Sequence, residues 1–272
     1  MSEEASEIFG FYARVVGDVP YPTLTLAFTE RDVPGGHSPA YFAVVDQPVQ
    51  PSLSWRSDPV NFDNYPAFFI AHEIAHQWWG QAVGWKNYHE QWLSEGFAQY
   101  FAVLYAEQHL PSGVMNNIVR QMRRTAIRES DQGPIYLGYR LGHINGDPRV
   151  FRSVAYNKSA MVLHMLRMLV GDEAFFTGVR TFFQEWKYRK AGTDDLLAVM
   201  EQASGQDLSA FFDAWIFGAR IPEARFSYRV ERNRAILRLE QAGPAMVFPV
   251  SVRLRYRSGR EETIVMVARG PV

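Results

Sequence analysis

The spacing of apolar residues along this 272-residue chain changes twice, and each change predicts a different kind of secondary structure. In residues 3–16 the large apolar side chains recur every three or four positions, which predicts a short amphipathic helix. Apolar and polar residues then alternate in Thr23–Thr29, and Ala40–Val45 is almost wholly apolar, so each segment predicts a strand. The pair Gly35-Gly36 separates the two strands. The amino-terminal part of the chain is therefore expected to combine one helix with a small β structure.

The middle of the chain follows a helical pattern. Residues 46–66 are rich in proline and predict an irregular surface loop. Pro66 suits the first turn of a helix, and the run AFFIAHEIAHQWW after it predicts a helix that ends near Gly80. We expect Ser153 and Thr193 to cap two of the later helices. Six further helices are predicted, at Leu93–Glu107, Val114–Glu129, Ser153–Leu169, Asp172–Tyr188, Thr193–Ala203 and Leu208–Phe217.

Beyond Pro222 the apolar period returns to two. In Phe248–Tyr256 valine and leucine alternate with serine and arginine, which is typical of a sheet with one face in water. The sequence thus predicts an α+β protein in two parts. Residues 1–220 form a mostly helical domain with a small amino-terminal β part, and residues 221–272 form a small β-sandwich-like domain. The four strands of the second part are predicted at Arg225–Val230, Ala235–Leu239, Phe248–Tyr256 and Thr263–Ala268.

Charge is distributed unevenly between these two parts. The formal net charge of the chain is −1, which gives no support for a nucleic-acid partner. Residues 220–272 contain eleven Arg, no Lys and five acidic residues, a net charge of +6 against −7 for the rest of the chain. We interpret the arginines mainly as the solvated faces of strands.

Several features that would define other classes of protein do not occur in the sequence. There is no cysteine, which excludes disulfides and thiolate metal sites. No apolar run approaches the roughly 20 residues that a membrane-spanning helix needs. The start, MSEEASEIFGFY, is acidic and lacks the pattern of a signal peptide. The compartment stays open, and the abrupt start and end lead us to expect a piece of a longer protein with further domains.

The segment His72-Glu73-Ile74-Ala75-His76 carries the chemistry of the chain. On a helix, residues four apart lie about 40° apart around the axis, so both imidazoles project from one face and can bind one metal ion. Glu73 is rotated about 100° away and can act on a water at the open position of the metal. The ordinary interpretation is a pair of half-buried histidines, and a third ligand is what separates the two interpretations.

Glu95 is the candidate third ligand, because it begins the next predicted helix 19 positions after His76. That distance leaves room for the first helix to end, for a loop to reverse direction and for the second helix to pack alongside. A single glutamate near a helix start is usually explained by the helix dipole, but His72 and His76 shift the interpretation to a ligand. His89 in the intervening loop is a weaker rival.

These residues resemble a known family. HEIAHQWWG followed by WLSEGFAQY is similar to the aminopeptidase N family of gluzincin zinc metallopeptidases, with Ser94 where asparagine is usual. The resemblance implies a thermolysin-like catalytic domain, one Zn²⁺ per chain on His72, His76 and Glu95, and a peptide as the substrate. It also implies that Tyr156, in the segment Val154–Ser159, donates a hydrogen bond to the oxyanion.

One departure from the family concerns substrate binding. Its aminopeptidases usually carry a Gly-x-Met-Glu-Asn loop whose Glu binds the α-amine of the substrate. The matching stretch here, Gly35–Tyr41, contains no Glu. Gly36 and His37 are nevertheless expected to line the substrate groove as an edge strand.

The function expected from these residues is zinc-dependent hydrolysis of peptide bonds by a zinc-activated water, with Glu73 as general base. An aminopeptidase is the first hypothesis. An endopeptidase with the same site is the first alternative, which the missing Glu favours. The second alternative is a peptidase-like fragment that binds zinc but is inactive without further domains. Trp79 and Phe97, which flank the motifs, are expected to belong to the core.

Overall fold

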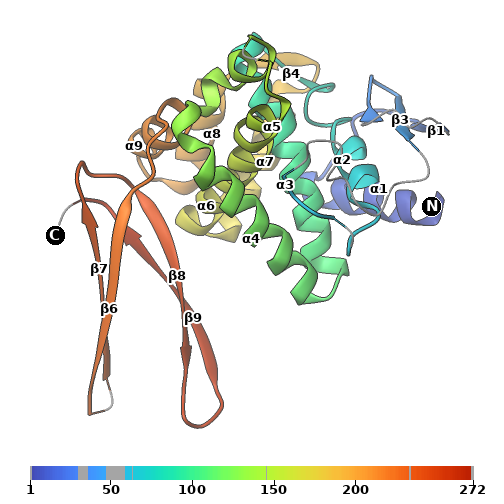
Figure 1. Ribbon diagram of the computed structural model, residues 1–272. Helices are drawn as coiled ribbons and strands as arrows, with labels where there is room; N and C mark the ends of the chain where they lie inside the picture. Colours follow the sequence, from blue (N-terminus) through green and yellow to red (C-terminus); the bar gives the residue numbers. More distant parts are fainter. Residues whose placement is uncertain are drawn as a thin grey trace.

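The computed structural model describes residues 2–29, 36–46, 59–62, 64–144, 146–232 and 234–270. The fold is α+β, with a large helical body, a small sheet near the amino terminus and two long hairpins that extend from the body (Figure 1). Most of the residues predicted to form the irregular loop 46–66 lie outside the described ranges.

The amino-terminal helix α1 (Ser2–Val16) confirms the predicted amphipathic helix. Its apolar face is buried against the helical body, and Ile8 and Tyr12 are fully buried. The Tyr12 hydroxyl donates a hydrogen bond to the carbonyl oxygen of Ala71 at 3.1 Å. This bond ties α1 to the helix that carries the His-Glu-x-x-His segment.

A three-stranded sheet follows α1, with the strand order β1-β3-β2. Strand β1 (Thr25–Thr29) pairs in parallel with β3 (Phe42–Asp46), which confirms the two predicted strands with starts shifted by two residues. The short strand β2 (Gly36–His37) pairs antiparallel with β3, in the register Gly36↔Val45 and His37↔Val44. Since β2 pairs only with β3, it is an edge strand of this sheet.

Helices α2 (Phe68–Ala75) and α3 (Gln91–His109) pack against each other at the centre of the body. The prediction that the first helix would continue to near Gly80 is wrong by about four residues. After Ala75 the backbone turns more tightly, with bonds from Gln77 to Ile74 and from Trp78 to Ala75, and Gly80 then has a φ of +108°. His76 is therefore the helical C-cap of α2 rather than part of its interior.

The remaining helices surround this pair and include three π-helical segments. The prediction that Ser153 caps a helix is wrong, because the helical run begins earlier, at Asp147, whose side chain accepts from the backbone N–H groups of Arg149 and Val150. Thr193 is likewise not a cap, because Gly192 precedes the helix and its N–H donates to Asp195. These helices are α4 (Ser112–Arg128), η5 (Arg140–Ile144), α5 (Pro148–Phe151), η6 (Arg152–Lys158), α6 (Ser159–Val170), α7 (Asp172–Trp186), α8 (Thr193–Ser204), α9 (Ser209–Phe212) and η7 (Asp213–Phe217).

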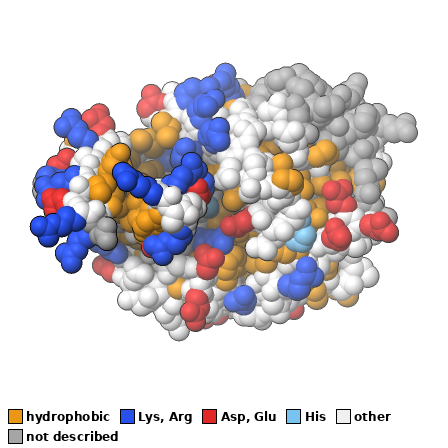
Figure 2. Space-filling view, turned by 90° about the horizontal axis from the view of Figure 1, so that it is seen from below, with side chains coloured by type: hydrophobic (Ala, Val, Ile, Leu, Met, Phe, Trp, Pro, Cys, Tyr) orange, Lys and Arg blue, Asp and Glu red, His pale blue; other side chains and the backbone are white. Residues whose placement is uncertain are grey.

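The carboxyl-terminal part consists of two antiparallel hairpins, which confirm the four predicted strands. Strand β6 (Glu223–Glu231) pairs with β7 (Arg234–Ala242), and β8 (Phe248–Arg255) pairs with β9 (Glu261–Ala268). Seen from below, positively charged side chains surround exposed apolar ones on the hairpins (Figure 2). None of the helices within the described ranges combines the length and the apolar character that crossing a membrane requires.

Candidate metal centre

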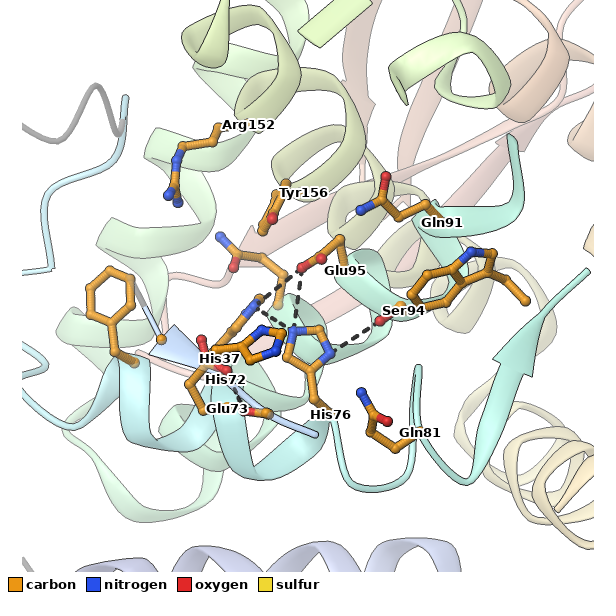
Figure 3. A pocket seen from close by; sticks show the side chains of 15 residues that line it. His37, His72, Glu73, His76, Gln81, Gln91, Ser94, Glu95, Arg152 and Tyr156 are labelled. Atoms are coloured by element: carbon orange, nitrogen blue, oxygen red, sulfur yellow. Dashed lines mark hydrogen bonds and ion pairs between the residues drawn. The ribbon is translucent and has the colours of Figure 1, made fainter. Parts of the chain in front are cut away.

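His72, His76 and Glu95 meet at one point, His72 from α2, His76 from its C-cap and Glu95 from α3 (Figure 3). The two imidazole Nε2 atoms are 3.1 Å apart. Each of them lies 3.4 Å from the Glu95 Oε2 atom. The three predicted ligands therefore form a compact triangle of one oxygen and two nitrogen atoms.

The start of α3 holds Glu95 in this position. One turn earlier, the buried Glu90 carboxylate accepts hydrogen bonds from the backbone N–H and the hydroxyl of Thr193, at 2.9 and 2.6 Å. The indole of Trp92 donates to the same hydroxyl at 3.0 Å. Because Thr193 begins α8, these bonds fix the first turn of α3 to a second helix.

His76 has a defined outer hydrogen bond, whereas His72 does not. The Nδ1 atom of His76 lies 3.0 Å from the Trp79 carbonyl oxygen, and the Ser94 hydroxyl, which also donates to that carbonyl, lies 3.1 Å from the same Nδ1. A carbonyl acceptor at Nδ1 favours the tautomer with its proton there, which leaves Nε2 available to a metal. The Nδ1 atom of His72 is buried and has no hydrogen-bond partner among the residues that the structure describes.

The three side chains are coupled electrostatically. Burial by itself lowers the pKa of His76, but the Glu95 carboxylate outweighs burial and raises the pKa of His76 to about 9. Burial by itself raises the pKa of Glu95, but His76 and His72 hold the pKa of that carboxyl well below its ordinary value. The cluster therefore favours positive charge among its three atoms, which a divalent cation supplies.

The donor set fits zinc. Zinc binds imidazole nitrogen and carboxylate oxygen at 2.0–2.2 Å in a tetrahedral arrangement, so neighbouring ligand atoms are expected about 3.3 Å apart. The observed separations of 3.1 and 3.4 Å agree with that value. Glu95 Oε2 is also buried and faces both imidazole Nε2 atoms, as expected of an atom that binds the same metal. Two histidines and one glutamate leave the fourth zinc position open for water or substrate.

Glu73 lies beside the triangle and is held by the loop after β2. Its carboxylate is buried, and its Oε2 atom accepts a short hydrogen bond from the Ser38 hydroxyl (Figure 3). Gly36 approaches Glu73 so closely that a Cβ atom at Gly36 would overlap the Glu73 side chain. Glu73 thus lies next to the predicted metal ligands but outside their cluster, and its role as general base stays a prediction.

Tyr156 approaches the centre from η6. Its ring lies nearly parallel to that of His72, with centroids 5.8 Å apart and an interplanar angle of 13°. Burial, reinforced by the charge of Glu95, raises the pKa of Tyr156 well above its ordinary value, so the phenol keeps its proton at neutral pH. The structure therefore brings the predicted oxyanion donor to the metal ligands.

The three predicted ligands, Glu73 and Tyr156 line one cavity of about 270 Å³. Gly36 and His37 lie on its wall, but Gly36 faces Glu73, and the role of both residues in substrate binding stays a prediction. No sequence pattern predicts the contact between Ser38 and Glu73, because 35 positions separate the two residues. The cavity is lined by Gly36, His37, Ser38, Phe69, His72, Glu73, His76, Gln81, Trp85, Gln91, Ser94, Glu95, Gln99, Arg152 and Tyr156.

Three further residues near the motifs, His89, Trp79 and Phe97, lie outside the ligand cluster. His89 is not part of the ligand cluster, and its Nδ1 atom contacts the carbonyl oxygen of Tyr136 at 2.9 Å. Trp79 and Phe97 belong to the core as predicted, with stacked rings 4.5 Å apart. Neither aromatic ring lines the cavity.

The helical fold, the two histidines with a glutamate and the neighbouring Glu73 together define a zinc metallopeptidase. Residues 61–215 match the Peptidase family M1 domain, and the chain belongs to this family. The match includes every residue of the ligand triangle, together with Glu73 and Tyr156. Membership of this family agrees with Zn²⁺ as the metal that the His72, His76 and Glu95 group would hold.

Two curated relatives are aminopeptidases. The chain is 27% identical over 200 residues to Aminopeptidase M1-C of Oryza sativa subsp. japonica, a match that covers 73% of this chain and 23% of the relative. It is 31% identical over 156 residues to Aminopeptidase N of Lactococcus lactis subsp. lactis, covering 55% of this chain and 18% of the relative. The matched part thus spans less than a quarter of the length of either relative.

Solved structures confirm the fold. Legionella pneumophila aminopeptidase A in complex with aspartic acid matches with a TM-score of 0.68 at 17% identity, covering 97% of this chain and 30% of that chain. An M1 zinc metallopeptidase from Deinococcus radiodurans matches with a TM-score of 0.59 at 22% identity, covering 81% and 45%. Both matches extend beyond the residues that the family domain covers.

Proposed function

We propose that this chain hydrolyses peptide bonds at the amino terminus of peptides, as a zinc aminopeptidase. The observation that carries the proposal is the convergence of His72, His76 and Glu95 with Glu73 directly beside them. A protein that only binds zinc has no need of a held carboxylate next to its ligands. The names of the curated relatives support the choice of an aminopeptidase.

His72, His76 and Glu95 hold the metal in this proposal. When bound there, zinc would act as a Lewis acid that polarises the substrate carbonyl and lowers the pKa of a bound water to about 7. The burial of the Glu95 Oε2 atom and the outer bond from His76 to the Trp79 carbonyl support this ligand arrangement.

Glu73 and Tyr156 move and hold protons. Glu73 takes a proton from the attacking water and passes it to the nitrogen of the departing amine as the C–N bond breaks. Tyr156 donates its phenol hydrogen to the carbonyl oxygen of the substrate, where negative charge develops. Its raised pKa keeps this hydrogen in place through the reaction.

Selection of a free amino terminus requires a group in the cavity that binds the α-ammonium of the substrate. Among the described residues that line the cavity, Glu73 and Glu95 are the only carboxylates, and the mechanism uses both. This observation favours an endopeptidase as the second candidate, since an α-ammonium group then has no carboxylate of its own to bind.

One experiment distinguishes the two candidates. Peptides of one sequence, with a free or an N-acetylated amino terminus, are hydrolysed by the zinc-loaded protein and the products are identified by mass spectrometry. An aminopeptidase releases the first residue of the free peptide and leaves the acetylated one intact. Equal turnover of both peptides would exclude the aminopeptidase, and turnover of neither would exclude peptide hydrolysis by this chain.

We also propose that the chain has two units, a catalytic unit of residues 1–220 and a β-sandwich-like unit of residues 221–272. Support comes from the order of the elements, since the helices end at Phe217 and the four long strands follow. Further domains of a longer protein would extend the second unit. Limited proteolysis near residue 221 that releases a folded, zinc-binding fragment would support this division.

A further inference from the structure

The segment between β2 and β3 is hydrogen-bonded to the turn that directly follows the metal-binding helix α2. The side chain of Gln77, one turn after Glu73, is buried and accepts a hydrogen bond from the Tyr41 backbone N–H at 3.0 Å. It also donates to the Pro39 carbonyl at 3.1 Å. Tyr41 takes a left-handed conformation, with a φ of +68°, where the loop turns into β3. These two bonds hold Pro39 and Tyr41 next to the carboxyl-terminal end of α2.

This attachment brings two residues of the loop against opposite parts of the Glu73 side chain. The Ser38 hydroxyl donates to Oε2, and both residues are 5% exposed. The backbone of Gly36 lies against Cγ, Cδ and Oε1, where a Cβ atom could not be accommodated. The carboxylate of Glu73 is thus confined between a hydroxyl donor and a backbone without a side chain.

We propose that the segment Gly36–Ser38 positions the general base Glu73. Ser38 is the positioning residue, and Gly36 lacks a side chain that would overlap Glu73. The inference rests on the proposed function, because Glu73 is the general base of that reaction. It gives a second role to a segment that is also expected to bind substrate. A glutamate side chain has three rotatable bonds, and a general base works only within hydrogen-bond reach of the proton it takes. The Ser38 bond holds Oε2, and the close approach of Gly36 limits the positions that the rest of the carboxylate can take.

A purely structural role of Ser38 predicts different behaviour. In that case Ser38 simply satisfies a buried carboxylate, and its removal lowers stability without a specific effect on turnover. Ser130 provides a matched control, because it is also buried and its hydroxyl donates to the Ala219 carbonyl at 2.6 Å, outside the cavity. Both serines lose one buried hydrogen bond when replaced by alanine.

The test compares Ser38→Ala, Ser38→Thr and Ser130→Ala in the zinc-loaded protein. We expect Ser38→Ala to lower kcat at least tenfold with KM and zinc content nearly unchanged, because misplacement of a catalytic group by about 1 Å can cost as much as 100-fold. Ser38→Thr, which keeps the hydroxyl, is expected to retain most of kcat. Ser130→Ala is expected to lower the thermal midpoint but to leave kcat at the wild-type value.

A double substitution isolates the path of the effect. In a Glu73→Gln background, Ser38→Ala is expected to cause no further loss, because the group that it positions is already gone. Wild-type kcat in a folded, zinc-loaded Ser38→Ala protein would overturn the inference. An equal further loss in the Glu73→Gln background would do the same, since Ser38 would then act independently of Glu73.

A crystallographic readout keeps the test independent of activity. Structures of the wild type, Ser38→Ala and Gly36→Ala are expected to show the Glu73 carboxylate displaced in both variants and fixed in the wild type. An unchanged Glu73 in Ser38→Ala would overturn the inference even if no peptide were ever hydrolysed. An inactive wild type with the expected displacement would instead overturn the proposed function and leave the positioning device in place.

Discussion

The ring of Tyr156 lies parallel to the ring of the proposed zinc ligand His72, at a centroid distance of 5.8 Å. Phe151 meets the same phenol edge-on, at 5.5 Å and 80°. These two contacts leave the phenol little freedom to rotate, although it belongs to a π-helical segment more than 70 positions along the chain from His72. A ring held in this way presents its hydroxyl in a fixed direction, which is what stabilisation of a developing oxyanion requires.

Replacement of Tyr156 by phenylalanine removes only that hydroxyl. We expect Tyr156→Phe to lower kcat by about 10²–10³-fold with full zinc content, which is the usual cost of losing one oxyanion donor. Steady-state kinetics and elemental analysis of the same sample measure both quantities. Tyr105→Phe is the control, because Tyr105 is buried outside the cavity. A kcat for Tyr156→Phe within threefold of the wild type would contradict the assigned role.

Glu95→Ala is expected to abolish tight zinc binding, because two imidazoles alone rarely hold the ion and the third ligand of a catalytic site is lost. A bound metal stabilises the folded state by mass action, so a chelator should lower the thermal midpoint of the wild type. It should leave the midpoint of Glu95→Ala unchanged. Scanning calorimetry with and without EDTA, together with elemental analysis, checks both statements. About one zinc per chain in Glu95→Ala would remove Glu95 from the ligand set.

Ser94→Ala should weaken zinc binding without abolishing it. The Ser94 hydroxyl and the Nδ1 atom of His76 share the Trp79 carbonyl, and loss of such outer contacts typically costs about 10–100-fold in metal affinity. Competition with a fluorescent chelator gives the affinity. Ser204→Ala, whose hydroxyl donates to the Met200 carbonyl far from the cavity, serves as control. Equal affinities of the two variants would show that Ser94 does not support the metal ligands.

Lys158 is expected to make the free energy of unfolding change with pH in the alkaline range. It is almost completely buried near the Gly218 carbonyl, and burial lowers the pKa of its amine to about 8. The unfolded chain keeps the ordinary pKa near 10.5, so between pH 8 and pH 10.5 it binds more protons than the folded chain. Stability from this group therefore rises with pH across that window.

The expected result is a difference between the wild type and Lys158→Met. Urea unfolding at pH 7.5 and pH 9.5 should show the wild type gaining stability relative to the variant at the higher pH. Because the comparison is a difference, other groups that titrate in the same range cancel to first order. Parallel pH dependences of the two proteins would mean that the Lys158 amine has a similar pKa in the folded and unfolded chains.

The metal ligands could be predicted from the sequence because covalent geometry fixes most of their arrangement. Residues four apart on one helix must share a face, and the 19 positions from His76 to Glu95 leave room for the chain to reverse and bring the next helix alongside. The π-helical turn around Tyr156 has no comparable signature, and this is why Ser153, placed by its residue type at a helix start, lies fully buried in the middle of a helical run.

The support of the general base could not be predicted either. Ser38 and Gln77 are common residue types without a distinctive pattern, and their bonds to Glu73 and to the loop depend on a sheet that brings distant segments together. The sequence predicts that Gly36 lines the substrate groove as part of an edge strand. The structure adds that the lack of a side chain there serves Glu73.

The geometry of the site depends on the number of residues in the π-helical turn from Arg152 to Lys158. Each residue turns an α-helix by about 100°, and a π-helical turn contains roughly one residue more than an α-helical one. Deleting a single residue here can leave a continuous helix, yet it rotates everything on one side against the other by that angle. Tyr156 and Lys158 could not then both keep their directions toward His72 and Gly218. A one-residue deletion would thus break up the proposed catalytic arrangement while every side chain discussed remained in the sequence.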